Sequence, residues 1–117
     1  MENYNPGTHI LSTFTAPQAA LTDMVRCADF FSGQVAALGL TAVGTVYHAF
    51  DNGGFTAVVC LVESHISIHT WPEHGLATFD VFLSNFRNDN GDKVQGIYRS
   101  TLEFFGGTET NLQTVMR

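Results

Sequence analysis

An Asn-Gly turn between two β-rich segments constrains the fold of this chain more than any other sequence feature. Residues 51–54 read Asp-Asn-Gly-Gly, and Asn-Gly supplies the positive φ angles that a tight hairpin turn requires. The flanking segments, 41–50 and 55–62, are rich in β-branched and aromatic residues, which favour strands. Because the second segment is almost wholly apolar, we predict that it lies inside a sheet.

Apolar periodicity predicts two helices. The first follows Thr15 and Gln18, whose spacing is that of a capping box, has Pro17 in its first turn, and ends at Gly39. Its apolar face consists of Leu21, Met24, Ala28, Phe31, Val35 and Leu38. The second helix precedes Gly106-Gly107, and its apolar stripe consists of Val94, Ile97, Thr101, Leu102 and Phe105.

The order of elements predicts the fold class. Further strands are expected over 8–14, 65–71, 76–84 and 112–117. Together with the helices they fit an α+β two-layer sandwich, in which a mainly antiparallel sheet carries two helices on one face. The other face would then meet solvent, or a second sheet in a dimer. A chain of 117 residues is long enough for one domain, 1–117, and too short for two.

Composition narrows the classes of function. The net charge is −6 with only five Lys and Arg, so we expect no nucleic-acid partner. No apolar run reaches the roughly 18 residues of a membrane helix, and residues 1–9 lack the basic and apolar regions of a signal peptide. We therefore expect a cytoplasmic protein whose cysteines, Cys27 and Cys60, are reduced and buried as small apolar residues.

The segment 62–75, VESHISIHTWPEHG, concentrates polar chemistry. The plainest interpretation is that its histidines are hydrogen-bonded polar residues on a sheet face. A metal site is a second interpretation, but the spacing matches no zinc pattern and we expect no metal. Its possible ligands are Glu63, His65, His69, Glu73 and His74. In a third interpretation Ser64 is a nucleophile with a histidine base, although the Gly-x-Ser-x-Gly elbow is missing.

The same stretch, continued to residue 82, resembles the signature of a known family. Residues 63–82 read ESHISIHTWPEHGLATFDVF. Bacterial and archaeal S-adenosylmethionine decarboxylase proenzymes carry Glu-Ser-His-x-x-x-His-Thr-Trp-Pro-Glu followed by a strand with Asp-Val-Phe. Gly-Thr-His at 7–9, Tyr-His-Ala-Phe at 47–50 and the closing Val-Met-Arg extend the likeness to nearly the whole chain. The family's α+β sandwich agrees with the predicted order of elements.

The resemblance implies a chain that cuts its own backbone between Glu63 and Ser64. In this family the serine hydroxyl attacks the preceding carbonyl, the amide becomes an ester, and β-elimination leaves a pyruvoyl group at a new N-terminus. Residues 1–63 would form the β chain and residues 64–117 the α chain. The pyruvoyl group would form a Schiff base with S-adenosylmethionine and accept electrons as CO2 leaves, so that this lyase supplies the aminopropyl donor for spermidine.

The resemblance also assigns roles to four other residues. His69 corresponds to the histidine that assists processing by proton transfer. Thr56 stands where the family has a hydroxyl residue, and Phe50 where an aromatic ring contacts the adenine. Glu73 is expected to pair with the polar or cationic part of the substrate. Family members of this short type pair two processed protomers, which implies a homodimer.

One position departs from the family pattern. The family has a cysteine twenty residues after the pyruvoyl serine, where it donates a proton to the substrate's α-carbon, and this chain has Ser84 there. A hydroxyl is a much weaker acid than a thiol, whose reference pKa is about 8.5. Cys60 shares strand parity with Ser64 if the strand is regular, but we expect it to be inert. The departure keeps two alternatives open: a pyruvoyl-dependent ornithine or arginine decarboxylase of the same fold, or an unprocessed, non-catalytic partner protein.

Overall fold

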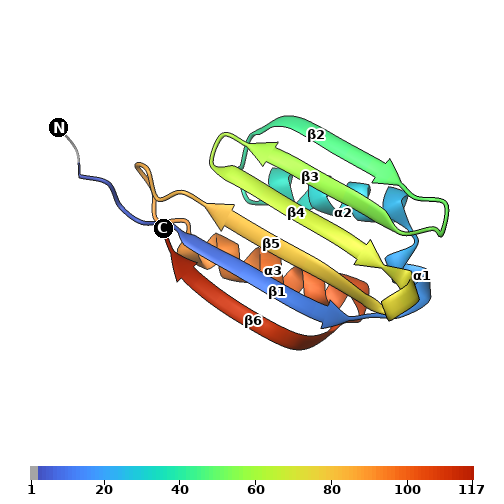
Figure 1. Cartoon of the computed structure of the whole chain (residues 1–117). Helices are drawn as coiled ribbons and strands as arrows, with labels where there is room; N and C mark the ends of the chain where they lie inside the picture. The colour runs from blue at the N-terminus through green and yellow to red at the C-terminus, as the bar shows by residue number, and fades with distance from the viewer. Residues whose placement is uncertain (1–2) are drawn as a thin grey trace.

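In the computed structural model, which describes residues 3–117, six strands form one sheet and the helices lie against one of its faces (Figure 1). The strand order is β2-β3-β4-β5-β1-β6, and neighbouring strands are antiparallel throughout. The strands are β1 (Thr8–Thr15), β2 (Ala42–Ala49), β3 (Phe55–Leu61), β4 (Ser64–Trp71), β5 (Leu76–Leu83) and β6 (Thr108–Met116). The predicted α+β two-layer sandwich is confirmed.

The Asn-Gly turn joins β2 to β3 as the sequence predicts. Gly53 has a φ of +89°, and the Phe50 N–H donates to the Gly54 carbonyl oxygen at 2.7 Å. β3 pairs with β2 on one side and β4 on the other, so its predicted interior position is confirmed. The last strand is longer than predicted, because β6 pairs with β1 along the whole of β1 and forms one edge of the sheet.

The helical layer is formed by segments from both halves of the chain. The helices are α1 (Gln18–Leu21), α2 (Met24–Ala37), the 3-10 turn η1 (Pro72–His74) and α3 (Gly91–Phe105). The two longer helices, α2 and α3, cover the same face of the sheet, as predicted (Figure 1). α3 ends at Gly106, whose φ of +62° is the left-handed conformation expected of a C-terminal glycine.

The prediction of one continuous first helix is wrong, because the chain breaks between α1 and α2. The Asp23 carboxylate accepts a hydrogen bond from the Arg26 N–H at 3.1 Å and thereby starts a new helix. The predicted capping box is also wrong. Pro17 is the N-cap of α1 without a side-chain bond, and Gln18 Nε2 donates instead to the Pro72 carbonyl oxygen at 2.5 Å. The capping aspartate therefore determines where α2 begins, although the apolar repeat continues across this position.

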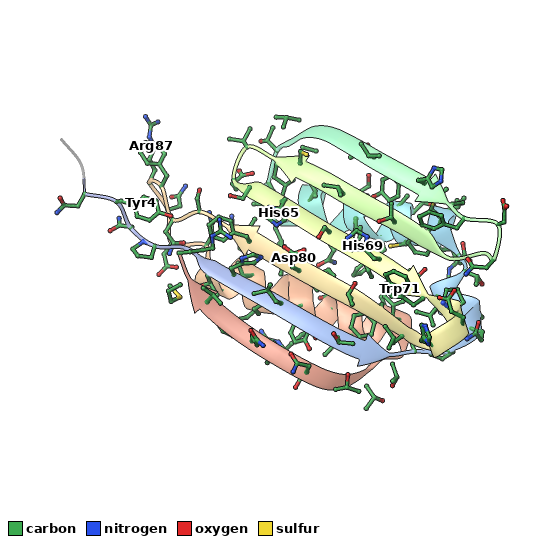
Figure 2. All side chains as sticks on the ribbon, in the orientation of Figure 1. Tyr4, His65, His69, Trp71, Asp80 and Arg87 are labelled. Carbon is green, nitrogen blue, oxygen red and sulfur yellow. The ribbon has the colours of Figure 1, made fainter. Side chains whose placement is uncertain are left out.

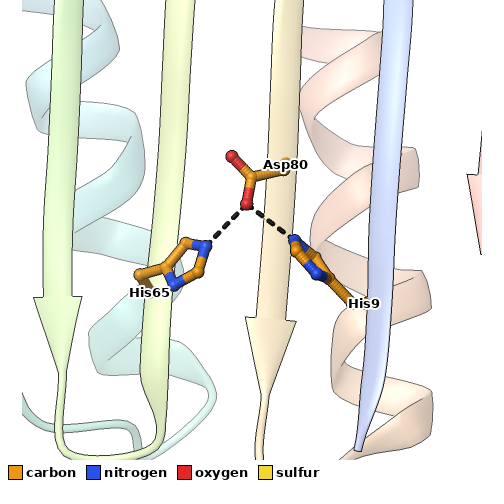
Figure 3. Close-up of side chains that lie close together, drawn as sticks. All are labelled: His9, His65 and Asp80. Atoms are coloured by element: carbon orange, nitrogen blue, oxygen red, sulfur yellow. Dashed lines mark hydrogen bonds and ion pairs between the residues drawn. The ribbon is translucent and has the colours of Figure 1, made fainter. Parts of the chain in front are cut away.

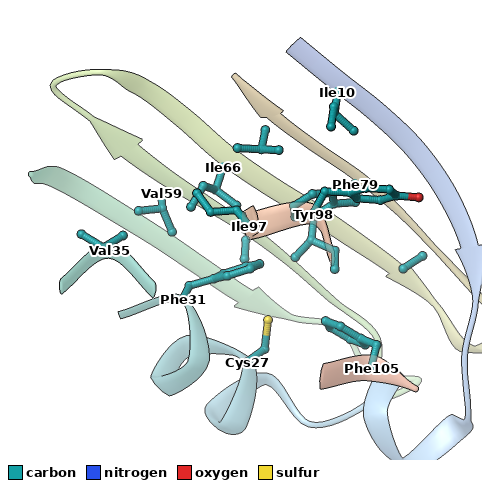
Figure 4. Close-up of a cluster of buried hydrophobic side chains, with 14 of the residues drawn as sticks. Ile10, Cys27, Phe31, Val35, Val59, Ile66, Phe79, Ile97, Tyr98 and Phe105 are labelled. Carbon is teal, nitrogen blue, oxygen red and sulfur yellow. The ribbon is translucent and has the colours of Figure 1, made fainter. Parts of the chain in front are cut away.

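The hydrophobic core lies between the sheet and the two long helices (Figure 4). Phe31 comes from α2, Ile97 and Phe105 come from α3, and Val59 and Ile66 come from the sheet. All are almost fully excluded from water, and burying an apolar side chain of this size stabilises a fold by about 1.5–3 kcal/mol. This packing holds one face of the sheet against the helices.

The two cysteines lie in different environments. Cys27 is buried in α2, and burial raises the pKa of its thiol to about 12. Cys60 is exposed, so the prediction that it is buried is wrong. Its predicted shared parity with Ser64 is wrong as well, because the chain reverses between them. Cys60 pairs with His65, whereas Ser64 pairs with Leu61.

The other face of the sheet carries no helix within residues 3–117, and Figure 2 shows His65, His69 and Asp80 on it. This agrees with the predicted uncovered face. Exposed apolar side chains also lie on the sheet, among them Leu11 and Val46. Among the described helices, none combines the length and the apolar character that crossing a membrane requires.

Candidate active site

The predicted cleavage bond lies in the tight turn that joins β3 to β4. Val62 and Glu63 form the turn, and Ser64 is the first residue of β4. Ser64 has a φ of +149°, which residues with a side chain rarely adopt; in residues 3–117 the other non-glycine residue with a positive φ is Arg87. Such a conformation costs on the order of 1–3 kcal/mol and is concentrated at functional sites. The residue that follows the predicted cleavage bond, Ser64, therefore has a strained backbone.

Glu63 is held at both of its polar ends. Its carbonyl oxygen accepts a hydrogen bond from the Ser84 N–H at 2.8 Å, and its Oε1 accepts one from the Thr41 N–H at 3.2 Å. An N–H directed at a carbonyl oxygen stabilises the negative charge that develops there during nucleophilic attack. The Glu63 carbonyl oxygen thus has a hydrogen-bond donor. We call the turn residues Val62 and Glu63, together with Ser64, the cleavage turn.

Ser84 reaches the cleavage turn through its backbone. It directly follows β5, and its own carbonyl oxygen accepts a hydrogen bond from Asn90 Nδ2 at 2.9 Å. Asn90 is only 4% exposed, so a buried amide fixes this segment. The structure therefore brings the predicted residues Glu63, Ser64 and Ser84 together. The hydrogen bond to Glu63 does not depend on which side chain stands at position 84.

Four other predicted residues meet at a cavity of about 370 Å³, which we call the aromatic pocket. Its lining consists of Phe50, Asn52, Phe55, Thr56, His69, Thr70, Trp71 and Glu73. Phe50 and Trp71 are 51% and 45% exposed, and large rings left open beside a cavity suit stacking on a flat ligand. The predicted residues Phe50, Thr56, His69 and Glu73 thus share one site.

Hydrogen bonds orient the polar groups of the aromatic pocket. Thr56 Oγ1 on β3 forms a hydrogen bond with His69 Nδ1 on the neighbouring strand β4. Asn52 Nδ2 donates to Glu73 Oε2 at 2.5 Å, and Asn52 Oδ1 accepts from the Gly54 N–H at 2.9 Å. Asn52 therefore fixes the direction of the Glu73 carboxylate.

Sequence reasoning missed Asn52 and Trp71 as members of this pocket. Both belong to motifs that the sequence makes conspicuous, the Asn-Gly turn and the Trp-Pro-Glu run. We interpreted the first as a turn signal and the second as a strand end. Their adjacency across the hairpin is a consequence of the sheet register, which brings the β2–β3 turn to the end of β4.

A third group of side chains, which we call the histidine–aspartate cluster, comprises His9, His65 and Asp80 (Figure 3). Nε2 of His9 and Nε2 of His65 both donate to Asp80 Oδ2, at 2.8 and 2.6 Å. Ser67 Oγ donates to the other carboxylate oxygen. Burial raises the pKa of Asp80, but the hydrogen bonds from His65, Ser67 and His9 outweigh this effect and lower the pKa to about 2. The carboxylate is therefore ionised at neutral pH.

The cluster is also the place in the described residues where three possible metal ligands converge, with ligand atoms within 4.8 Å of one another. Both imidazoles direct Nε2 at a single carboxylate oxygen, which is the geometry of a hydrogen-bonded network. Of the ligands considered from the sequence, His65 is the one in this group. His9 and Asp80 were missed because strand pairing, not sequence spacing, brings β1 and β5 to β4.

The cleavage turn and the aromatic pocket lie at opposite ends of β4. Ser64 is its first residue and His69 stands five residues later, which corresponds to about 17 Å along a strand. His69 projects from the helix-free face (Figure 2), whereas the strand partners of Ser64, Leu61 and Leu83, are buried in the core. Within one chain, His69 therefore does not reach the Glu63–Ser64 bond.

The fold is an α+β two-layer sandwich with an open, polar sheet face and a strained residue at the Glu63–Ser64 bond. The chain belongs to the S-adenosylmethionine decarboxylase family, whose model matches residues 8–117.

Named relatives agree with this membership. The S-adenosylmethionine decarboxylase proenzyme of Aquifex aeolicus is 47% identical over 77 residues, which are 65% of this chain and 57% of that protein. The proenzyme of Archaeoglobus fulgidus is 44% identical over 66 residues, which are 56% of this chain and 55% of that protein. The chain thus spans a little over half the length of these curated relatives.

A solved structure extends the likeness to the whole fold. The crystal structure of the adenosylmethionine decarboxylase from Aquifex aeolicus matches with a TM-score of 0.79 at 28% identity, over 98% of this chain and 91% of that one.

Proposed function

We propose that this chain is a self-processing, pyruvoyl-dependent decarboxylase that acts on S-adenosylmethionine. The observation that carries the proposal is the Glu63–Ser64 bond, which lies at a strained residue and whose carbonyl accepts a hydrogen bond from Ser84. Family membership, and relatives that are named S-adenosylmethionine decarboxylase proenzymes, support the same chemistry.

Processing begins when the Ser64 hydroxyl attacks the Glu63 carbonyl carbon. Negative charge develops on the oxygen that the Ser84 N–H contacts, and one such donor contributes about 10²–10³ in rate. The C–N bond then breaks and leaves an ester between Glu63 and the Ser64 oxygen. A base removes the Ser64 Cα proton, the Cβ–O bond breaks, and Glu63 leaves as a carboxylate. Water then releases ammonia from residue 64.

The residues at the turn fit a pyruvoyl group at position 64. A pyruvoyl group has no backbone nitrogen and therefore no φ, so its formation removes the strain that a φ of +149° imposes on Ser64. Once formed, the group supplies the electron sink that loss of CO2 from the substrate requires.

The aromatic pocket has the chemistry to bind the adenosyl and sulfonium parts of the substrate. The half-exposed rings of Phe50 and Trp71 offer faces to a flat purine and to a cation. Glu73, held by Asn52, adds a carboxylate for polar or cationic groups. His69, held by Thr56, adds an imidazole for proton transfer.

The proposal includes a homodimer, because one chain leaves His69 remote from Ser64. In the dimer the helix-free sheet faces meet, and His69 and Thr56 of one copy lie near the β3–β4 turn of the other, where the half-buried Ser64 turns toward the interface. The exposed apolar side chains Leu11 and Val46 supply contact surface for this pairing. Each complete site then draws on both copies.

The intact mass of the purified protein tests processing. We expect two chains, 1–63 and 64–117, and a keto group in place of the amino group at residue 64. The matched control is Ser64→Ala, which is expected to remain one chain of 117 residues. An uncut wild-type chain with an unmodified serine would contradict the proposal.

The substrate is tested by CO2 release from processed protein. S-adenosylmethionine is expected to react, and ornithine and arginine are not. Release from an amino acid that lacks adenine, with none from S-adenosylmethionine, would contradict the roles of Phe50 and Trp71.

A further inference from the structure

A second cavity, of about 320 Å³, opens beside the cleavage turn. Its lining includes Glu63, Ser84, Arg87, Asn88, Asn90 and Lys93. Arg87 lies in the loop that follows β5, at the same end of the molecule as the cleavage turn (Figure 2), and Lys93 lies in the first turn of α3. The carbonyl end of the cleavage bond therefore faces its own cavity, which is separate from the aromatic pocket.

This cavity is positively charged in a chain that is otherwise acidic. The chain has a net charge of −6 and only five Lys and Arg, and two of these five line the cavity. The N-terminus of α3, to which Lys93 belongs, adds partial positive charge, and the exposed Asp92 of the same first turn lies outside the cavity lining. Glu63 is the acidic residue in the lining. The nearby Asp89 is engaged elsewhere, because its Oδ1 accepts from the Gly91 N–H at 2.9 Å.

We propose that this cavity is a carboxylate-binding site for the new C-terminus that cleavage creates at Glu63, an inference that rests on the proposed function. When the ester breaks, the electron pair of the Ser64 Cβ–O bond goes to the Glu63 carboxylate and the Cα proton goes to the base. One oxygen of the nascent carboxylate already contacts the Ser84 N–H at 2.8 Å. Lys93 and Arg87 provide the opposite charge in the same cavity.

The contacts also determine which of the two new ends stays in place. Glu63 keeps its side-chain bond to Thr41 and its backbone bond to Ser84 after cleavage. Ser64 has a strained backbone, which is free to relax once the peptide bond is gone. The β chain is therefore anchored at Glu63, and residue 64 is the end that moves away to meet substrate. Holding the carboxylate also keeps it from attacking residue 64 again.

A thermal double-mutant cycle tests the site. Lys93→Gln and Arg87→Gln are combined in the wild-type chain, which is cleaved, and in Ser64→Ala, which has no new carboxylate. In cleaved protein we expect the melting temperature to fall by about 3 °C, as is typical for losing partly exposed ion pairs in a chain of this size. In the Ser64→Ala background we expect no change. High salt should abolish the difference, because a concentration near 1 M shortens the screening length to about 3 Å.

Arg99→Gln is the matched control, since Arg99 is an exposed cation on the same helix outside the cavity lining. It should leave both backgrounds unchanged. Equal losses in the cleaved and uncleaved backgrounds would overturn the inference and leave processing intact. Variants that no longer cleave would also overturn it, because the cations would then act before the carboxylate exists. Failure of the wild type to cleave, seen by mass, would overturn the proposed function itself.

Discussion

The two ends of β4 carry chemistry of different kinds. At the cleavage turn, two of the three groups proposed to act in processing belong to the backbone, the carbonyl of Glu63 and the N–H of Ser84, and the third is the Ser64 hydroxyl. At the aromatic pocket the groups are side chains, above all the rings of Phe50 and Trp71. The hydrogen bond between the two backbone groups survives replacement of the side chain at position 84 by any residue except proline, whereas the rings of the pocket are lost with their side chains. The change from cysteine to serine at position 84 therefore leaves the proposed backbone donor in place.

Removing the backbone donor at position 84 is expected to slow cleavage strongly. Ser84→Pro has no N–H, and we expect cleavage to slow by about 10²–10³. Ser84→Ala keeps the N–H and is expected to cleave at nearly the wild-type rate. The half-life of the uncut chain on a gel measures both, and thermal unfolding checks that each variant folds. Equal slowing by alanine and proline would show that the side chain at position 84, and not its backbone N–H, acts in cleavage.

The separation of Ser64 from His69 leads to a complementation experiment. We expect His69→Ala alone to cleave about 10²–10⁴ more slowly, the usual contribution of a general acid–base group. Ser64→Ala alone is not expected to cleave at all. When the two variants are co-expressed, the His69→Ala chain is expected to be cut, because its partner supplies the histidine. Mass spectrometry distinguishes the chains, and an uncut mixture would mean that His69 acts within its own chain or not at all.

Ser84→Cys separates processing from decarboxylation. A thiol is the stronger acid, with a reference pKa of about 8.5, so we expect the turnover of S-adenosylmethionine to rise by at least about tenfold. The rate of cleavage should not change, because the backbone N–H is the same in both proteins. The steady-state rate of formation of decarboxylated S-adenosylmethionine provides the measurement, because protonation follows the loss of CO2. An unchanged rate would indicate that another group already protonates the substrate.

The aromatic pocket is tested by truncating its rings. Phe50→Ala and Trp71→Ala should each raise KM by about tenfold, since stacking on a base contributes about 1–3 kcal/mol. Cleavage should proceed normally, because neither ring is assigned a part in processing. Tyr4→Ala is the control, since Tyr4 is also an exposed aromatic residue but lies outside the pocket. Slow cleavage of either variant would show that its ring also acts in processing.

The sequence predicts the secondary structure of this molecule better than the tertiary contacts between its elements. The hairpin turn, the strands and the stripe of α3 follow from patterns within about fifteen residues, and the structure confirms them. The break at Asp23 could not be predicted from periodicity, because the apolar repeat continues across it. Likewise, the exposure of Cys60 depends on where the chain reverses. His9 and Asp80 meet His65 only because β5 lies between β4 and β1, an order that is not encoded in any short motif.

The smallest expected effect concerns the histidine–aspartate cluster, which belongs to neither end of β4. The pKa of Asp80 is lowered from 3.8 to about 2 in the folded protein, so its ionised form stabilises the fold above about pH 4. This contribution is lost as the pH falls from about 4 to 2, and solvent screening reduces it to about 1 kcal/mol. Urea unfolding at pH 5 and pH 2 should therefore show a smaller pH-dependent loss for Asp80→Asn than for wild type, whereas Asp29→Asn, at an exposed helical position, should match wild type. The cluster connects β1, β4 and β5 and belongs to neither the cleavage turn nor the aromatic pocket. Asp80→Asn is therefore expected to leave both the rate of cleavage and the KM for S-adenosylmethionine unchanged. A change in the cleavage rate alone would assign the cluster to the cleavage turn, and a change in KM alone would assign it to the aromatic pocket.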